Sequence, residues 1–246
     1  MMPPSISQLP KPAFRLLGAA LLGLLAACQT ASHQEIYGNK PGPKGFSTVV
    51  LDAGHGGKDS GARARGQMEK ELTLDIAQRV KKELAGDFRV VMIRDGDQFV
   101  DLDDRVRKAN RYDGGVLVSV HFNYGPRRLA GPETYWWRVD SSSLARRLHQ
   151  NLMSACSVES GNRGLVRRRL RLTRNPEIPC VLVECGYLTN AREAALLKTP
   201  EYRAKLARAI ANALKDQKRH GDAGMGPLPA PIIAPPSKGS DARDSF

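Results

Sequence analysis

The stretch VVLDAGHGGKDSGA, residues 49–62, decides the fold of this chain. Its apolar start, Val49 to Leu51, has the composition of a buried strand and runs directly into a glycine-rich turn that carries His55. The glycines match neither the dinucleotide-binding fingerprint nor the Walker phosphate loop, in which Lys58 would be followed by Ser or Thr. The stretch therefore predicts a strand of an open α/β sheet, with His55 at the edge where such sheets bind ligands.

Short apolar runs alternate with longer helical patterns in the chain that follows. Such alternation is typical of strands that run parallel and are covered by helices on both faces. We therefore expect an α/β fold, a three-layer sandwich with a twisted, largely parallel central sheet. The expected strands are 47–52, 89–93, 116–120, 134–138 and 180–183, and the expected helices are 70–84, 102–111, 142–156 and 202–217.

A second histidine, His121, follows the apolar run of VLVSVHFN, residues 116–123. Imidazole is the commonest metal ligand in proteins, and catalytic zinc sites often combine two histidines with one carboxylate. Glu69, at the start of the helix after the glycine-rich turn, is the first candidate, although the same position would also suit compensation of the helix dipole. Glu71 is its competitor, but about 100° of rotation per residue places the two carboxylates on different helix faces.

Another carboxylate, Glu184, ends a third apolar run in CVLVECGYLTN, residues 180–190. An acid at the edge of a core is costly without a partner, and a buried carboxylate near a metal site is suited to general-base catalysis. A salt bridge to a nearby arginine is the structural alternative. The adjacent Cys185 suggests thiol catalysis with His121, but that interpretation leaves the other histidine and Glu69 without a role.

These segments, with the RVRKAN stretch at residues 105–110, resemble the N-acetylmuramoyl-L-alanine amidases of the AmiC type over about residues 47–217. The resemblance implies a zinc hydrolase that cuts the amide between N-acetylmuramic acid and the first L-alanine of the peptidoglycan stem peptide. It implies one Zn²⁺ per chain held by His55, Glu69 and His121, with Glu184 as catalytic acid and base. Weaker candidates for substrate binding are Asn123, Arg174 and Asn190.

This chain departs from the family pattern at two places. Ala53 stands where many members have proline, which affects loop stiffness more than chemistry. Only 63 positions separate His121 from Glu184, which leaves no room for the inhibitory helix that division-associated members carry. We expect a domain that needs no activator protein. Competing hypotheses are an inactive, lipid-anchored peptidoglycan-binding module and a zinc peptidase that cuts elsewhere in the stem.

The N-terminal residues have the pattern of a bacterial export signal. Lys11 and Arg15 precede an apolar stretch from Leu16 to Ala27 that is too short to span a bilayer. The following Cys28 completes a lipobox-like LAAC, which predicts lipidation, although an ordinary signal peptide with an incidental cysteine is the alternative. Because Gln29 is not Asp, the rule for Gram-negative lipoproteins predicts a periplasmic protein anchored to the outer membrane.

The domain organisation follows from composition. We expect a signal peptide at 1–27, a tether at 28–45, the zinc amidase catalytic domain at 46–220 and a disordered Pro/Gly-rich tail at 221–246, in a monomer. Signal removal lowers the net charge from +13 to +11, because it takes away two basic residues and no acid. A basic protein outside the cytoplasm is expected to bind the anionic groups of peptidoglycan and lipid rather than nucleic acid.

Three further features leave alternatives open. The cysteines beyond the signal, Cys156, Cys180 and Cys185, permit at most one disulfide, and the sequence does not choose the pair. His149, in an arginine-rich helix, is expected to be solvated. A basic run either binds stem-peptide carboxylates or forms a solvated loop. Its members are Arg163, Arg167, Arg168, Arg169, Arg171 and Arg174.

Overall fold

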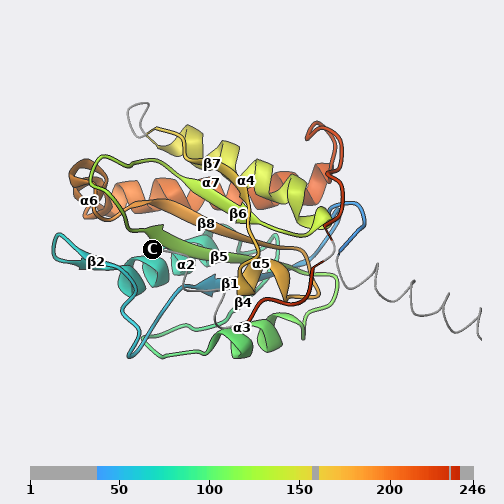
Figure 1. Cartoon of the computed structure of the whole chain (residues 1–246), viewed down its shortest axis with the longest axis horizontal. Helices are drawn as coiled ribbons and strands as arrows, with labels where there is room; N and C mark the ends of the chain where they lie inside the picture. The colour runs from blue at the N-terminus through green and yellow to red at the C-terminus, as the bar shows by residue number, and fades with distance from the viewer. Residues whose placement is uncertain (1–37, 157–160, 233, 239–246) are drawn as a thin grey trace, which may run out of the picture. The chain divides into compact units, whose positions relative to one another are not determined.

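The computed structural model describes residues 38–156, 161–232 and 234–238, which contain a six-stranded sheet with helices on both faces (Figure 1). The strand order is β4-β1-β5-β8-β6-β7. Neighbours are parallel from β4 to β8, β6 is antiparallel to β8, and β7 is parallel to β6. The strands are β1 (Thr48–Ala53), β4 (Arg89–Met92), β5 (Val116–Asn123), β6 (Glu133–Trp136), β7 (Gly164–Arg167) and β8 (Cys180–Tyr187).

Two hydrophobic clusters divide the helices between the faces of the sheet. The larger cluster packs alternate strand residues, such as Val49 and Leu51, against α2 (Glu69–Glu83), α4 (Ser142–Ala155) and α7 (Pro200–His220). The smaller packs the intervening residues, such as Val50, against the other helix layer. Its helices are α3 (Leu102–Ala109) and α5 (Arg171–Arg174). The predicted three-layer sandwich is therefore confirmed.

Local sequence explains where the long closing helix begins and ends. The Thr199 hydroxyl accepts from the Tyr202 N–H, and Pro200 occupies the first turn, where its missing N–H costs nothing. Gly221, at φ +55°, ends the helix. The helix thus extends beyond the predicted 202–217 at both ends, because capping residues rather than apolar periodicity set its limits.

Two strands are longer than predicted, and this changes the position of the chemistry. β5 continues to Asn123 and β8 to Tyr187, so His121 and Glu184 lie inside strands rather than at their ends. In this register His121 pairs directly with Glu184. Several short elements were not predicted, because too few residues carry a periodic pattern. They are β7, α5, α6 (Ala191–Leu197), a 3₁₀ turn η1 (Val139–Ser141) and the hairpin of β2 (Arg63–Ala64) and β3 (Gln67–Met68).

The described part of the tail makes specific contacts. Ser237 donates its backbone N–H to the side chain of Asn175, and Arg174 donates to the carbonyl of Ala234. The boundaries 1–27, 28–45, 46–220 and 221–246 remain predictions. Cys28 and the signal segment lie outside the described residues. No helix among the described residues is both long enough and apolar enough to cross a bilayer.

The three cysteines of the domain, Cys156, Cys180 and Cys185, are buried free thiols. His149 is also buried and contacts Thr134 and Asn162 through its two ring nitrogens, so the expectation of a solvated histidine was wrong. The helix face that carries His149 packs on the sheet, which its arginine neighbours concealed in the sequence.

Candidate active site

Three side chains from separate elements converge at the carboxyl edge of the sheet. His55 comes from the turn after β1, Glu69 is the first residue of α2, and His121 lies in β5. One oxygen, Glu69 Oε1, lies 3.0 Å from His55 Nε2 and 2.9 Å from His121 Nδ1. The candidate ligand atoms of the three residues lie within 4.8 Å of one another. Two imidazole nitrogens and a carboxylate oxygen in this arrangement form a donor set that suits Zn²⁺.

Glycine makes this convergence sterically feasible. A Cβ at Gly54 would lie 2.3 Å from the His121 ring, and one at Gly61 would lie 2.6 Å from Glu69 Oε2 and from His55 Cδ2. His55 itself adopts φ +61°, a left-handed conformation that is uncommon for a non-glycine residue. The surrounding structure must therefore hold the turn in place.

Two buried arginines stabilise this turn by donating hydrogen bonds to its backbone carbonyls. Arg94 donates to the carbonyls of Ala53 and Gly54, each at 2.8 Å. Arg105 donates to the carbonyls of Ala53 and His55, at 2.8 and 2.6 Å. Four charge-assisted hydrogen bonds thus fix three consecutive carbonyls, including that of the strained His55.

Asp52, at the end of β1, is the counter-ion of one of these arginines. It is fully buried and accepts from Arg105 Nη1 at 2.5 Å and from the Ser119 hydroxyl at 2.6 Å. Arg105 belongs to the RVRKAN stretch that carries the family resemblance, but its role could not be predicted from the sequence, and neither could that of Arg94. The one available signal for Arg105 was its position in the predicted helix 102–111, close to the apolar residues of the helix.

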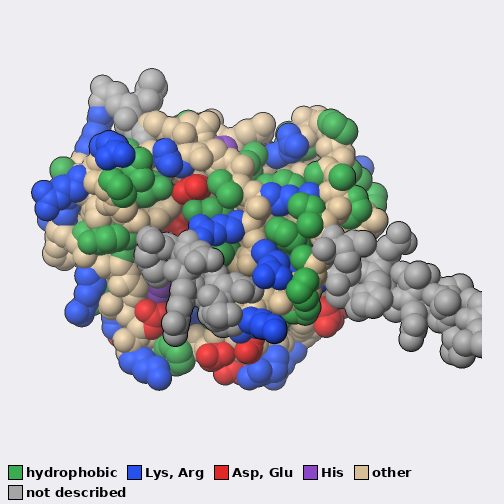
Figure 2. All heavy atoms as spheres, viewed as in Figure 1, with side chains coloured by type: hydrophobic (Ala, Val, Ile, Leu, Met, Phe, Trp, Pro, Cys, Tyr) green, Lys and Arg blue, Asp and Glu red, His purple; other side chains and the backbone are tan. Residues whose placement is uncertain are grey.

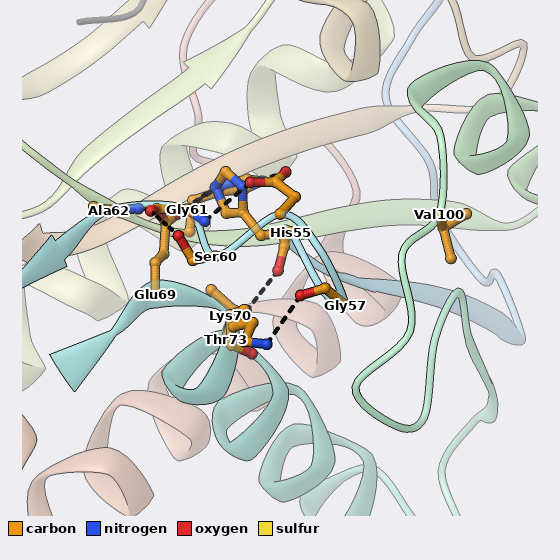
Figure 3. Close-up of polar contacts among 12 residues, drawn as sticks. His55, Gly57, Ser60, Gly61, Ala62, Glu69, Lys70, Thr73 and Val100 are labelled. Atoms are coloured by element: carbon orange, nitrogen blue, oxygen red, sulfur yellow. Dashed lines mark hydrogen bonds and ion pairs between the residues drawn. The ribbon is translucent and has the colours of Figure 1, made fainter.

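The structure separates Glu69 from its competitor. Glu69 is 3% exposed, whereas Glu71 is exposed. The backbone N–H of Ala62 donates to Glu69 at 2.8 Å (Figure 3). The backbone N–H of Phe122 donates to the same carboxylate at 3.1 Å. Burial alone would raise the pKa of Glu69, but hydrogen bonds with His121 and His55 outweigh it and lower that pKa. Glu69 is therefore held as a carboxylate between the two histidines.

Asp59 orients the first histidine, a role that was not predicted although Asp59 lies in the GHGGKDSGA turn. Its Oδ2 lies 2.8 Å from His55 Nδ1, on the ring side opposite Glu69. A carboxylate behind a metal-ligating histidine fixes the tautomer and the ring orientation. Burial lowers the pKa of His55, but hydrogen bonding and charge from Glu69 and Asp59 raise it overall.

Glu184 points a buried atom into the site without a partner. Its Oε2 has no hydrogen-bond partner among the described residues. Burial first, then the charges of Glu69 and Glu133, raise the pKa of Glu184 well above its ordinary value. A buried oxygen without a partner beside two imidazoles fits a site that is completed by a metal ion and water. Cys185 points to the opposite face of β8, and burial raises its thiol pKa, which disfavours the thiolate needed for catalysis.

A cavity of about 460 Å³ opens over these residues. His55, Glu69, His121 and Glu184 line it. Apolar side chains form much of the remaining wall and its rim. They include Phe99, Leu102, Tyr124, Tyr135, Leu170 and Leu172.

The three weaker candidates have different environments. Asn123 lines the cavity and donates to the Glu133 carboxylate at 2.9 Å. Arg174 lies outside the cavity lining, buried beneath the tail. Asn190 also lies outside it and caps α6 by accepting from the backbone N–H groups of Arg192 and Glu193. The structure brings only Asn123 to the candidate metal-binding residues.

Comparison with known proteins agrees with this site. A family profile described as N-acetylmuramoyl-L-alanine amidase matches residues 49–216. The uncharacterized protein YqiI of Bacillus subtilis (strain 168) is 34% identical over 201 residues, which cover 79% of this chain and 93% of YqiI. The N-acetylmuramoyl-L-alanine amidase LytC of the same organism is 35% identical over 167 residues, which cover 66% of this chain but only 34% of LytC.

Solved structures extend the similarity to three dimensions. The N-acetylmuramoyl-L-alanine amidase AmiC2 of Nostoc punctiforme superposes with a TM-score of 0.66 at 35% identity, covering 70% of this chain and 97% of AmiC2. The profile spans β1 to α7 and includes all four candidate site residues. This chain therefore belongs to the N-acetylmuramoyl-L-alanine amidase family of peptidoglycan-hydrolysing enzymes.

Proposed function

We propose that the protein is a zinc-dependent amidase that hydrolyses the bond between the lactyl group of N-acetylmuramic acid and L-alanine. The observation that carries the proposal is the convergence of His55, Glu69 and His121, with Glu184 paired to His121 across β5 and β8. A bound Zn²⁺ supplies Lewis acidity toward the scissile carbonyl and the attacking water.

The protein's own residues divide the remaining work. Glu184 accepts a proton from the attacking water and delivers it to the departing L-alanine amine. The raised pKa of Glu184 favours this role, since a group that must both accept and donate works best when its pKa lies near the operating pH. Asp59 holds the His55 ring, and Glu69 separates the two imidazoles.

We also propose where the enzyme works. The LAAC segment and the basic, apolar N-terminus support export and lipidation of Cys28, with anchoring to the outer membrane on the periplasmic side. Peptidoglycan is the partner there, in wall remodelling or daughter-cell separation. The short spacing between His121 and Glu184 supports an enzyme that needs no activator protein, and we expect it to be a monomer.

Digestion of purified sacculi by the zinc-loaded protein tests the activity. We expect intact stem peptides with a free L-alanine amine, identified by mass spectrometry, and no product from Glu184→Ala or after chelation of the metal. Shortened peptides would indicate a zinc peptidase, and binding without product would indicate an inactive binding module. A protein that is inert alone but becomes active with a partner would contradict the absence of an activator.

Metabolic labelling with a palmitate analogue tests the anchor. We expect the full chain to take up the label and Cys28→Ala to lose it. Retention of label by Cys28→Ala would disprove lipidation at this residue without bearing on the amidase activity.

A further inference from the structure

The cavity carries opposite charges in different parts of its wall. The acidic residues that line it are Asp59, Glu69, Glu184 and Asp101. Asp59 and Glu69 contact the histidines, and Asp101 caps α3 by accepting from the Asp103 N–H. Arg105, which is paired with Asp52, also lines the cavity. Arg168 and Arg171 line the part formed by residues 168–172, which we call the arginine wall.

Only two members of the basic run reach this cavity. Arg168 and Arg171 line it, whereas Arg163, Arg167, Arg169 and Arg174 do not. The difference follows from the local structure, because β7 ends at Arg167 and α5 begins at Arg171. The turn between these elements directs the two side chains into the cavity.

Contacts with neighbouring side chains position the guanidinium groups of Arg168 and Arg171. Arg168 lies over the ring of Tyr135, at 5.7 Å from its centroid, and Tyr135 also lines the cavity. Tyr135 pairs with Leu182 in the strand that carries Glu184, so Arg168 lies on the Glu184 side of the cavity. Arg167 instead stacks on Trp136, 4.8 Å from its ring centroid.

The Arg171 side chain extends toward α3, which contributes Leu102 to the cavity lining. Arg171 Nη1 donates to the backbone carbonyl of Ser237 at 2.5 Å and lies 3.3 Å from Asp103 Oδ1, whose side chain is 52% exposed. The carbonyl is uncharged, and the long pair with an exposed carboxylate is weak, so most of the positive charge of the guanidinium is left uncompensated. The Arg171 Nε is buried and has no hydrogen-bond partner among the described residues. Apolar Leu170 and Leu172 flank it and lower the local dielectric, which strengthens pairing with an anion.

We propose that Arg168 and Arg171 form a carboxylate-binding subsite that selects stem peptides with a free α-carboxylate on the residue after L-alanine. This inference rests on the proposed amidase function, which puts the scissile amide at Glu184 and the peptide in the cavity. The planar guanidinium fork matches a carboxylate and distinguishes it from the neutral amide that replaces it in amidated stems. Separate patches of Lys and Arg side chains on the face in Figure 2, and the net charge of +13, would also favour approach of an anionic substrate.

Binding measurements can test the subsite without turnover. The zinc-loaded Glu184→Gln protein would be titrated calorimetrically with N-acetylmuramoyl-L-alanyl-γ-D-glutamyl-L-lysine and with its D-isoglutaminyl counterpart, which differ only in whether the α-carboxyl of the second residue is free or amidated. We expect the free carboxylate to bind about tenfold more tightly or better, because a charge-assisted hydrogen bond is replaced by a neutral contact in the amide. Adding Arg168→Gln or Arg171→Gln should reduce or abolish this preference and leave affinity for the amidated ligand nearly unchanged.

Two controls keep the result interpretable. Arg208→Gln removes one positive charge from an exposed position on α7, outside the cavity lining, and should preserve the preference. Arg168→Lys and Arg171→Lys keep the charge but remove the fork, and they should give an intermediate preference. Thermal unfolding verifies that each variant is folded.

The outcomes separate this inference from the proposed function. Equal affinity for the two ligands, or equal loss of both in the arginine variants, would overturn the subsite. Cleavage of the muramoyl amide by the wild-type protein would then still support the amidase. Conversely, a carboxylate preference that depends on the two arginines, in a wild-type protein that cleaves neither ligand, would support the subsite and contradict the amidase.

Discussion

Arginine side chains have different roles in two regions of the site, the His55 turn and the arginine wall. Beneath the turn, Arg94 and Arg105 are 1% and 2% exposed, and their donors are used on backbone carbonyls and Asp52. On the arginine wall, Arg168 and Arg171 are partly exposed and line the cavity, although Arg171 also donates to the Ser237 carbonyl. Arg105 lines the same cavity, but its charge is paired with that of buried Asp52. The same residue type therefore fixes the geometry of one region and offers charge to a ligand in the other.

Glu184 lines the cavity that both regions border, and changing it should have the largest effect. Glu184→Gln removes the proton acceptor, so we expect kcat to fall by about 10²–10⁴-fold. Zinc content and unfolding temperature should be retained, because the substitution preserves shape and removes a buried carboxyl whose Oε2 has no hydrogen-bond partner among the described residues. Steady-state kinetics on a defined muropeptide, with metal analysis of the same sample, measure both. A variant with near-normal kcat would exclude Glu184 as the general base.

Arg105→Met should be the most destabilising change beneath the turn. It leaves Asp52 as a buried charge without its partner, which costs about 3–5 kcal/mol in unfolding free energy. Arg168→Met on the arginine wall is the matched control, and it should change stability much less. Urea denaturation measures both. Similar losses in the two variants would contradict the distinction between the two regions.

Asp59→Asn should weaken the metal site without unfolding the protein. The carboxylate that holds His55 Nδ1 becomes an amide, and loss of such a supporting contact lowers metal affinity by about 10–100-fold. Competition with a chelator of known affinity measures the change. Asp97→Asn is the control, because Asp97 holds the Gly57 N–H of the same turn without contacting His55. An unchanged affinity in Asp59→Asn would show that the arginines alone orient the ring.

Asp103→Asn should have the smallest effect on stability. The pair with Arg171 is long and exposed, so its loss should change the unfolding free energy by less than about 1 kcal/mol. The same substitution removes the anion that competes with a ligand for Arg171, so affinity for a free-carboxylate muropeptide should rise slightly. Weaker binding of that ligand would argue that Asp103 positions Arg171 rather than competes for it.

Much of the fold and part of the candidate site could be predicted from residue patterns. Apolar runs located β1, β5 and β8, and the polar residues that follow or interrupt them are His55, His121 and Glu184. Helical rotation favoured Glu69 over Glu71 only weakly, whereas burial at the start of α2 separates them clearly. The missed elements are short or arginine-rich, and short segments contain too few turns to show a period.

The supporting contacts could not be predicted, because they join residues far apart in sequence. Arg94 and Arg105 reach back about forty to fifty residues to the carbonyls of the His55 turn. Glu133 stands beside Glu184 because β6 pairs antiparallel with β8, a register that no local pattern specifies. Burial of His149 likewise depends on which face of α4 meets the sheet.

The sequence by itself determined the α/β class, the family and the residue types that can bind a metal and move a proton, because these follow from local apolar periodicity and from motif order. Only the tertiary structure decided which atoms meet. Strand order and register placed His121 opposite Glu184, packing beneath the turn held His55 at φ +61°, and the turn from β7 into α5 selected Arg168 and Arg171 from the basic run. Distances between elements depend on register and side-chain packing, which are properties of the folded chain as a whole.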